Sequence, residues 1–146
     1  MSAELLFSVL NPLVLPGWLL LIVAPRWKWT ARLIGAALLP GLFGLVYATL
    51  LLVYFRSAEG SFGSLEGVAK LFQNPYLLLA GWLHYLAFDL FVGSWEVRDA
   101  QRMGIRHWYV IPCLVLTFLF GPTGLLLYFI LRWRLKGTLW IGDDHA

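Results

Sequence analysis

Charged side chains are scarce in this chain of 146 residues, of which only 13% are Asp, Glu, Lys or Arg. A soluble domain averages about 25% charged residues, so this composition excludes a surface that faces water on all sides. Hydrophobic residues make up 60% of the chain and aromatic residues 16%, and the mean hydropathy is +0.76. We therefore predict an integral membrane protein with a single membrane domain over residues 1–146 and no separate soluble domain.

Cysteine is almost absent as well, because Cys113 is the single one in the chain. One cysteine excludes an intramolecular disulfide and a metal site built from cysteine pairs. The net charge is +3, and its basic residues are dispersed between apolar runs. We interpret them as anchors to lipid headgroups, so we expect the lipid bilayer as a partner and no nucleic acid. The first apolar run lacks a preceding basic segment and a cleavage site, so we expect a retained helix and no signal peptide.

Long apolar runs define the expected fold, which is an all-α integral membrane bundle of four transmembrane helices. We expect these helices at about residues 5–24, 31–55, 75–97 and 108–132. Residues 56–74 form the longest loop. Within that loop, the apolar spacing over Leu65 to Phe72 predicts a short amphipathic helix at the membrane interface.

Prolines and glycines predict where these helices are irregular. Asn11, Pro12 and Pro16 interrupt the first helix, so we expect a kink near Asn11 with Asn11 as its cap or support. The turn-like sequence Gly121-Pro122-Thr123-Gly124 predicts a kinked or locally unwound fourth helix. Small residues in the second helix predict a face for close packing against another helix. They are Gly35, Ala36, Ala37, Gly41, Gly44 and Ala48.

Four spans divide the basic residues almost evenly between the two membrane faces, six against five. One face would hold Arg26, Lys28, Arg32, Arg98, Arg102 and Arg106, and the other Arg56, Lys70, Arg132, Arg134 and Lys136. The first loop carries three cations and the segment before it none. This favours an orientation with both termini outside the cytoplasm.

Two polar side chains, His84 and Asp89, lie inside the third apolar run. Such residues are costly in hydrocarbon and are retained where they face a bundle interior, find partners or carry out a function. At about 100° per residue, Asp89 shares a stripe with Tyr85 and Glu96. His84 lies about 140° around the helix, on a stripe that also holds Phe88, Phe91 and Trp95. We expect the two side chains to flank one interior sector, with a ligand or another helix between them.

The chemistry of the pair is that of general acids and bases, since histidine exchanges protons near neutral pH and a buried aspartate tends to its protonated form. Structural alternatives stay open for both: His84 could bond a backbone carbonyl or Asn11, and Asp89 could bond Tyr85 or a hydroxyl of another helix. We expect the charges at the helix end to be solvated, namely Glu96, Arg98 and Asp99, and His107 to be interfacial. No spacing matches a metal motif, so no metal or other cofactor is expected.

The second half of the chain resembles a known family. The motifs are Trp82-Leu83-His84, Asp89-Leu90-Phe91, Asp99, Arg106-His107, Cys113 and Gly121-Pro122-Thr123-Gly124. Together they resemble the abscisic-acid-deficient-four family of neoxanthin synthase-like membrane proteins. Its plant members are plastid membrane proteins required for making neoxanthin from violaxanthin. The resemblance covers residues 75–132 well, and in the first half it rests on the placement of apolar helices and on Ala24-Pro25.

The resemblance implies a carotenoid as ligand and an epoxide-to-allene isomerisation of it without net redox change. In that reaction an acid protonates the epoxide oxygen and a base removes a proton from the polyene. The resemblance makes Asp89 the acid and His84 the base or the residue that orients the base. The expected substrate-binding residues are Tyr85, Phe88, Phe91 and Trp95 as an aromatic wall, and Arg106 and His107 at a terminal-ring oxygen. The chain is short and lacks a plant-type transit peptide, which predicts a bacterial inner-membrane protein.

Two other functions remain compatible with the sequence. The first is a non-catalytic membrane protein that holds a pigment or lipid between its helices. The second is a small transporter or assembly subunit that uses Asp89 and His84 as a proton relay and works as a homo-oligomer.

Overall fold

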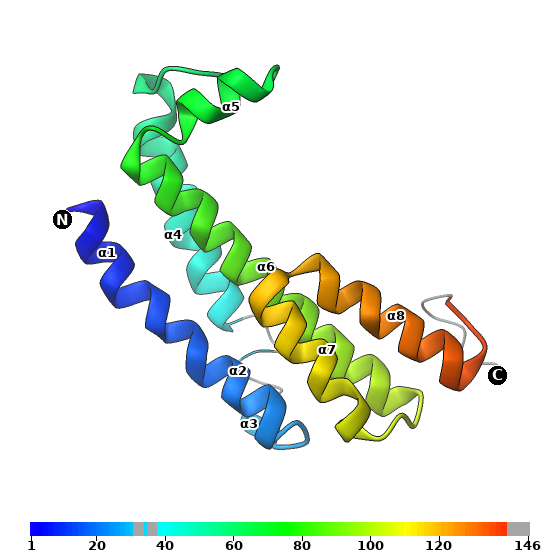
Figure 1. Cartoon of the computed structure of the whole chain (residues 1–146). Helices are drawn as coiled ribbons and strands as arrows, with labels where there is room; N and C mark the ends of the chain where they lie inside the picture. Colours follow the sequence, from blue (N-terminus) through cyan, green and yellow to red (C-terminus); the bar gives the residue numbers. More distant parts are fainter. Residues whose placement is uncertain (31–33, 35–37, 140–146) are drawn as a thin grey trace.

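The computed structural model describes residues 1–30, 34 and 38–139. Helices run through these residues and no strand occurs among them, which confirms the predicted all-α class (Figure 1). The elements are α1 (Ala3–Leu10), the 3₁₀ helix η1 (Asn11–Leu13), α2 (Val14–Val23), α3 (Lys28–Thr30), α4 (Leu38–Tyr54), the 3₁₀ helix η3 (Phe55–Ser57), α5 (Leu65–Leu71), α6 (Pro75–Arg102), α7 (His107–Phe120) and α8 (Pro122–Lys136). Three stretches are long and apolar enough to cross a membrane: Ala3–Val23, Leu38–Ser57 and Pro75–Arg102.

The first span is interrupted by a 3₁₀ turn where a kink is predicted. This turn, η1, begins at Asn11 and continues through Pro12, whose missing N–H favours a break in the α-helical ladder. The Asn11 side chain accepts a hydrogen bond of 2.8 Å from the Trp82 indole on α6. The turn is therefore held by a neighbouring helix, which supplies the cover that an irregular backbone needs in lipid.

The second span packs on α6 through large side chains and not through the small ones. Phe43 and Leu50 of α4 are buried, whereas no atom of a described residue lies within 4 Å of a Cβ built at Gly41 or Gly44. The prediction of close helix packing at these two glycines is therefore wrong, and Ala48 is exposed as well. The other three small residues, Gly35, Ala36 and Ala37, lie outside the described residues.

The predicted amphipathic helix is present as α5, which lies across the end of the bundle where α6 begins (Figure 1). Ser64 caps it by accepting a hydrogen bond from the Gly67 amide. The two faces of α5 differ in exposure, since Leu71 is buried and Leu65 is 87% exposed. We call this end of the molecule the Asn74 end, after the residue that caps α6, and the opposite end the Arg102 end.

The third span, α6, continues five residues beyond the predicted end at residue 97, to Arg102. Asn74 caps its start through hydrogen bonds to the amides of Tyr76 and Leu77. The extra turn carries Asp99, which is 3% exposed because α8 covers it. The acidic residues near this end, Glu96 and Asp99, are buried against protein, whereas Arg98 and Arg102 are exposed.

The fourth predicted helix, 108–132, is not a single helix. The chain reverses at Gly121, whose φ of 48° and ψ of −104° end α7 and begin α8. With 14 and 15 residues, the two helices are about 21 and 22 Å long, which is less than the hydrocarbon thickness of about 30 Å. They pack side by side against the second half of α6 (Figure 1).

Glycine is required where α7 and α8 meet. A Cβ at Gly124 would overlap the backbone nitrogen of Thr117 and lie 2.5 Å from the carbonyl oxygen of Cys113. The sequence Gly121-Pro122-Thr123-Gly124 therefore supplies both the reversal and the close contact just after it. The expected kink is instead the turn of a helical hairpin.

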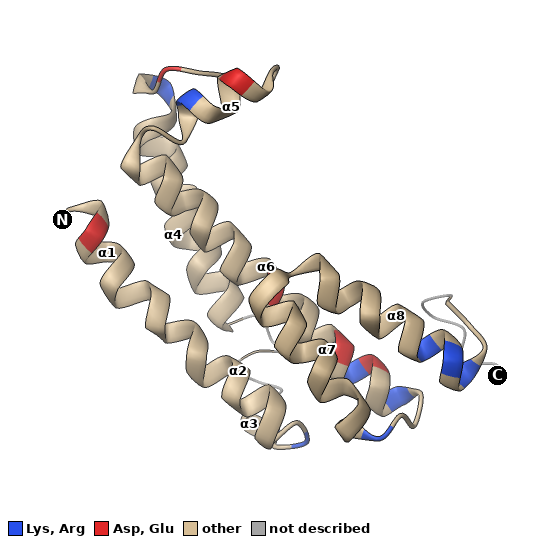
Figure 2. Ribbon diagram, in the orientation of Figure 1, with Lys and Arg blue, Asp and Glu red and all other residues tan. Residues whose placement is uncertain are grey.

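This hairpin changes the predicted arrangement of termini and charges. The start of α1 and the end of α8 lie at opposite ends of the molecule (Figure 1), whereas the predicted topology has both termini at one face of the membrane. The predicted even split of cations is wrong, because α8 returns to the Arg102 end (Figure 2). Among the described residues that end holds Arg26, Lys28, Arg98, Arg102, Arg106, Arg132, Arg134 and Lys136, and the Asn74 end holds Arg56 and Lys70.

Candidate functional site on two faces of α6

His84 and Asp89 lie on different stripes of α6, as the helical spacing predicts. His84 is exposed and borders α4, whereas Asp89 is 9% exposed and lies beside the turn between α7 and α8. Asp89 does not line the cavity that His84 borders. The two expected catalytic residues are thus part of one helix but of two separate environments.

His84 lines a cleft between α4, the loop with α5, and the first half of α6. The cavity has a volume of about 220 Å³ and a mostly apolar lining. The lining residues are Tyr47, Leu51, Phe55, Phe62, Leu71, Phe72, Leu77, Ala80, Gly81 and His84. The imidazole stacks on Phe88 at a centroid distance of 4.5 Å and lies 5.5 Å from the ring of Tyr47. An ionisable ring is therefore held between aromatic rings at the wall of an apolar cavity.

The expected aromatic wall of α6 divides between these two environments. Phe88 and Phe91 continue the His84 stripe and are 58% and 46% exposed. Trp95 instead packs on α8, edge-on to Tyr128 at 5.5 Å and beside Phe129 at 5.7 Å. Only the first two residues, with His84, thus form an open aromatic surface.

Asp89 faces the α7–α8 turn. A Cβ at Gly121 would lie 3.0 Å from Oδ1 and 3.3 Å from Oδ2 of Asp89, so the carboxyl group packs directly against the turn backbone. The Tyr85 hydroxyl lies within interaction range of this carboxyl group and donates a hydrogen bond of 3.4 Å to the Phe118 carbonyl. The contact between Tyr85 and Asp89 is the structural alternative that the sequence left open. Asp89 Oδ2 is buried without a hydrogen-bond partner among the described residues.

Two further carboxyl groups on the same side of α6 are buried. Glu96 is fully buried and accepts a 3.0 Å hydrogen bond from the Thr117 hydroxyl on α7. Asp99 accepts a 2.7 Å hydrogen bond from the Tyr128 hydroxyl on α8. Figure 2 shows the acidic positions of α6 in the region that α7 and α8 cover. The expectation that Glu96 and Asp99 are solvated is therefore wrong, and the reason is the cover that the hairpin provides.

Asp99 is the centre of a charged group at the Arg102 end. Its Oδ2 lies 3.1 Å from Arg132 Nε, and its Oδ1 lies 2.9 Å from Arg102 Nη2. Arg132 is fully buried, so it was wrongly counted among the cations of a membrane face. Arg98 is exposed, as the sequence predicts. This group binds the C-terminal end of α8 to the end of α6.

Sequence reasoning missed Thr117, Tyr128 and Arg132 as members of this polar core. A signal was present, because Tyr128 and Arg132 are four residues apart and share one face of an otherwise apolar helix. The acidic positions 89, 96 and 99 likewise share one side of α6. Neither stripe shows which helix covers the other, so the pairing was not predictable.

Arg106 and His107 lie far from the His84 cleft. His84 is 18 residues before Arg102, the last residue of α6, and this separation is about 27 Å along the helix. Arg106 comes after Arg102, directly before α7. The His107 ring bonds the Ile22 carbonyl at 2.9 Å through Nε2 and so connects α7 to α2. Among the described residues no group of three His, Cys, Asp or Glu side chains could hold a metal ion.

Comparisons with known proteins identify the family of this chain. No solved structure matches it. Protein ABA DEFICIENT 4, chloroplastic, from Arabidopsis thaliana is 29% identical over 140 residues. The match covers 89% of this chain and 61% of the relative. The chain thus spans about three fifths of the length of that relative. A family model described as ABA DEFICIENT 4-like matches residues 5–128, which is most of the chain. This membrane protein therefore belongs to the ABA DEFICIENT 4-like family.

Proposed function

We propose that this protein binds a carotenoid at the His84 cleft and isomerises an epoxide end group of it to an allene. The observation that carries the proposal is the position of His84, an ionisable ring at the wall of an aromatic cavity on a membrane-spanning helix. The resemblance to neoxanthin synthase-like proteins supplies the substrate class, and the ABA DEFICIENT 4-like membership supports it.

The size of the cleft suits one end of such a ligand. Its volume of about 220 Å³ is below the 300–1,000 Å³ or so of sites that enclose whole drug-sized ligands. A terminal ring would enter the cavity, and the polyene would extend over the exposed rings of Phe88 and Phe91. Lipid would cover the other side of the polyene, since both rings are on a membrane-spanning helix.

His84 is the residue of the cleft lining that we assign to proton exchange with the ligand. As imidazolium it would protonate the epoxide oxygen as the C–O bond breaks, and as imidazole it would then remove the polyene C–H proton. The products are a hydroxyl group and an allene, the histidine returns to its first state, and no electrons are gained or lost. In this scheme Asp89 supports the α7–α8 turn. Its expected role as the acid stays a prediction.

Conversion of violaxanthin by the purified protein in liposomes, followed by chromatography of the pigments, tests the proposal. We expect His84→Gln to abolish conversion and to keep pigment binding, because glutamine is polar but does not titrate. The control is Arg98→Gln, an exposed polar position of the same helix outside the cleft, which should convert normally. If Asp89→Asn abolishes conversion and His84→Gln does not, the roles given to the two residues are wrong. If the wild type neither binds nor converts the pigment, the function itself is wrong.

A pigment-binding protein without catalysis is the competing function. The observation in its favour is that no carboxylate lines the cleft with His84. Binding without conversion by the wild type would establish it. A homo-oligomeric transporter or assembly subunit stays a prediction, as does the bacterial inner membrane, and the Arabidopsis relative is chloroplastic by name.

A further inference from the structure

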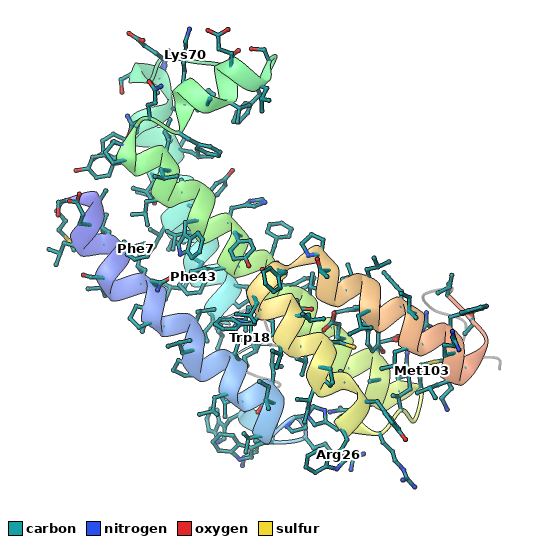
Figure 3. The ribbon with its side chains drawn as sticks, viewed as in Figure 1. Phe7, Trp18, Arg26, Phe43, Lys70 and Met103 are labelled. Carbon is teal, nitrogen blue, oxygen red and sulfur yellow. The ribbon has the colours of Figure 1, made fainter. Side chains whose placement is uncertain are left out.

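A second ligand site is indicated between α2 and α7, on the side of the bundle away from the His84 cleft. The two helices run side by side and are joined by the contact of Trp18 with Phe118 and by the bond from His107 to the Ile22 carbonyl. Figure 3 labels Trp18 between the helices and Arg26 beyond the end of α2. Two hollows follow this boundary one after the other.

The first hollow is apolar and has a volume of about 500 Å³. Its lining includes Leu15, Leu19 and Ile22 from α2, and Val115 and Phe118 from α7. All five residues lie in the apolar part of the bundle, where the bilayer supplies hydrocarbon chains. The hollow therefore has the surface chemistry of a groove for an acyl chain.

The second hollow follows at the Arg102 end and has a volume of about 610 Å³. Its lining includes Arg26 and Trp27 from the end of the first span, and Arg106 and Trp108 from the start of α7. No acidic side chain is among the described residues that line it. Neither Arg26 nor Arg106 has an ion-pair or hydrogen-bond partner among the described residues. The hollow therefore offers two unpaired guanidinium groups, with tryptophans of the kind found at membrane interfaces beside them. Arginine binds phosphate through paired N–H groups, so this chemistry suits a phosphate ligand.

The chain next to each arginine is hydrogen-bonded to a neighbouring helix. Gln101 donates a 3.0 Å hydrogen bond from Nε2 to the Pro25 carbonyl, next to Arg26. His107 bonds the Ile22 carbonyl next to Arg106. The backbone beside Arg26 is thus bonded to α6 and the residue beside Arg106 to α2, which fixes where the two arginine side chains start.

We propose that this groove binds one anionic phospholipid, with its phosphate between Arg26 and Arg106 and an acyl chain along the apolar hollow. The order of the two hollows, apolar in the membrane and basic at its surface, matches the order of tail and phosphate in a lipid. The site is independent of the His84 cleft and goes beyond the carotenoid function. It also gives the bond from His107 to Ile22 a role, which is to hold the groove at the boundary of its two parts.

Native mass spectrometry of the detergent-solubilised protein, offered equal amounts of phosphatidylglycerol and phosphatidylcholine, tests the site. We expect the wild type to retain phosphatidylglycerol. Replacement of both arginines, Arg26→Gln with Arg106→Gln, should lower its retention about tenfold or more, since each charge-assisted contact to phosphate is lost. The lysine pair, Arg26→Lys with Arg106→Lys, should restore part of it. The matched control is Arg98→Gln, an exposed arginine at the same end that does not line the groove.

One further variant and two competing ligands identify what the groove binds. Val115→Trp places a large ring in the apolar hollow, so it should lower lipid retention while both arginines stay in place. Inorganic phosphate and farnesyl diphosphate are added as competitors, and we expect neither to displace the lipid at equal concentration. Displacement by inorganic phosphate would show a simple anion site, and displacement by farnesyl diphosphate an isoprenoid site. Either result, or an equal loss in Arg98→Gln, would overturn the proposal. Unfolding temperatures of all variants confirm that the fold is kept.

Discussion

The two halves of α6 carry their polar side chains in opposite environments. In the first half, His84 is exposed and contacts only aromatic rings among the interactions described above. In the second half, Glu96 and Asp99 are buried, and side chains from α7 and α8 bond them. One helix thus has an open half, beside a cavity, and a closed half, under a hairpin.

The difference separates polar residues that hold the fold from those available to a ligand. A carboxylate that is buried with hydroxyl and guanidinium partners has its bonding capacity used by protein, and removal of one partner is costly. The exposed imidazole of His84 has no hydrogen-bond partner among the described residues, so its ring nitrogens are available to a ligand. A polar residue in an apolar helix therefore indicates function only after its partners are known, and by that criterion His84 is the stronger candidate.

The largest expected effect concerns the hairpin on which this comparison depends. We expect the N-terminal end of α1 and the C-terminal end of α8 to lie on opposite sides of the membrane. In a Cys113→Ser background, Ser2→Cys and Gly137→Cys should react with a membrane-impermeant maleimide from opposite sides of oriented vesicles. Labelling of both from one side would mean that α7 and α8 together form a fourth span, and the closed half of α6 would then not exist as described.

Loss of the buried cation should have the next largest effect. Arg132→Met leaves Asp99 buried without one of its charge partners, and we expect the free energy of unfolding to fall by about 3–5 kcal/mol. Unfolding in detergent followed by circular dichroism measures it. Arg134→Gln, at an exposed position of the same helix, is the control and should change stability by no more than about 0.5 kcal/mol. Equal stability of the two variants would show that the closed half is not held by its charges.

A methyl group added where α7 contacts α8 should lower the stability of the protein. Gly124→Ala pushes a Cβ into the backbone of Thr117, and we expect a loss of about 1–3 kcal/mol of unfolding free energy. Gly41→Ala is a matched control in α4, where the added methyl group meets open space. That change should raise stability by about 0.5–1 kcal/mol, because alanine favours a helix over glycine. A stable Gly124→Ala protein would place the hairpin helices farther apart than described.

The smallest effect on stability is expected in the open half. His84→Ala loses the ring contacts with Phe88 and Tyr47, and we expect a cost of about 0.5–1.5 kcal/mol in unfolding free energy. The same change should remove the isomerisation proposed above. A loss of stability as large as that of Arg132→Met would mean that His84 belongs to the fold, and the contrast between the two halves would disappear.

The sequence predicted those features that depend on local pattern. The apolar runs gave the three long helices, the spacing after Ser64 gave α5, and the angle between His84 and Asp89 gave two faces of α6. Each of these follows from residues close together in the chain.

Features that depend on distant packing were not predictable in the same way. A Gly-Pro pair in an apolar run is compatible with a kink and with a reversal, and the contact of Gly124 with Thr117 decides between them. Glu96 and Asp99 were expected in water because they lie near a helix end, and only the return of α8 covers them. The identity of the covering helix depends on three-dimensional packing, which one sequence does not show.

The hairpin also has a consequence for the order in which the protein is made. The chain is synthesised from its N-terminus, so α6 leaves the ribosome before α8. Asp99 is therefore made before Tyr128 and Arg132 exist, and it has no partner from α8 at that time. Until some thirty more residues have followed, counting from Asp99 to Arg132, its ion-pair partner is Arg102 on the same helix. Completion of α8 is then the step that supplies the buried partners of Asp99.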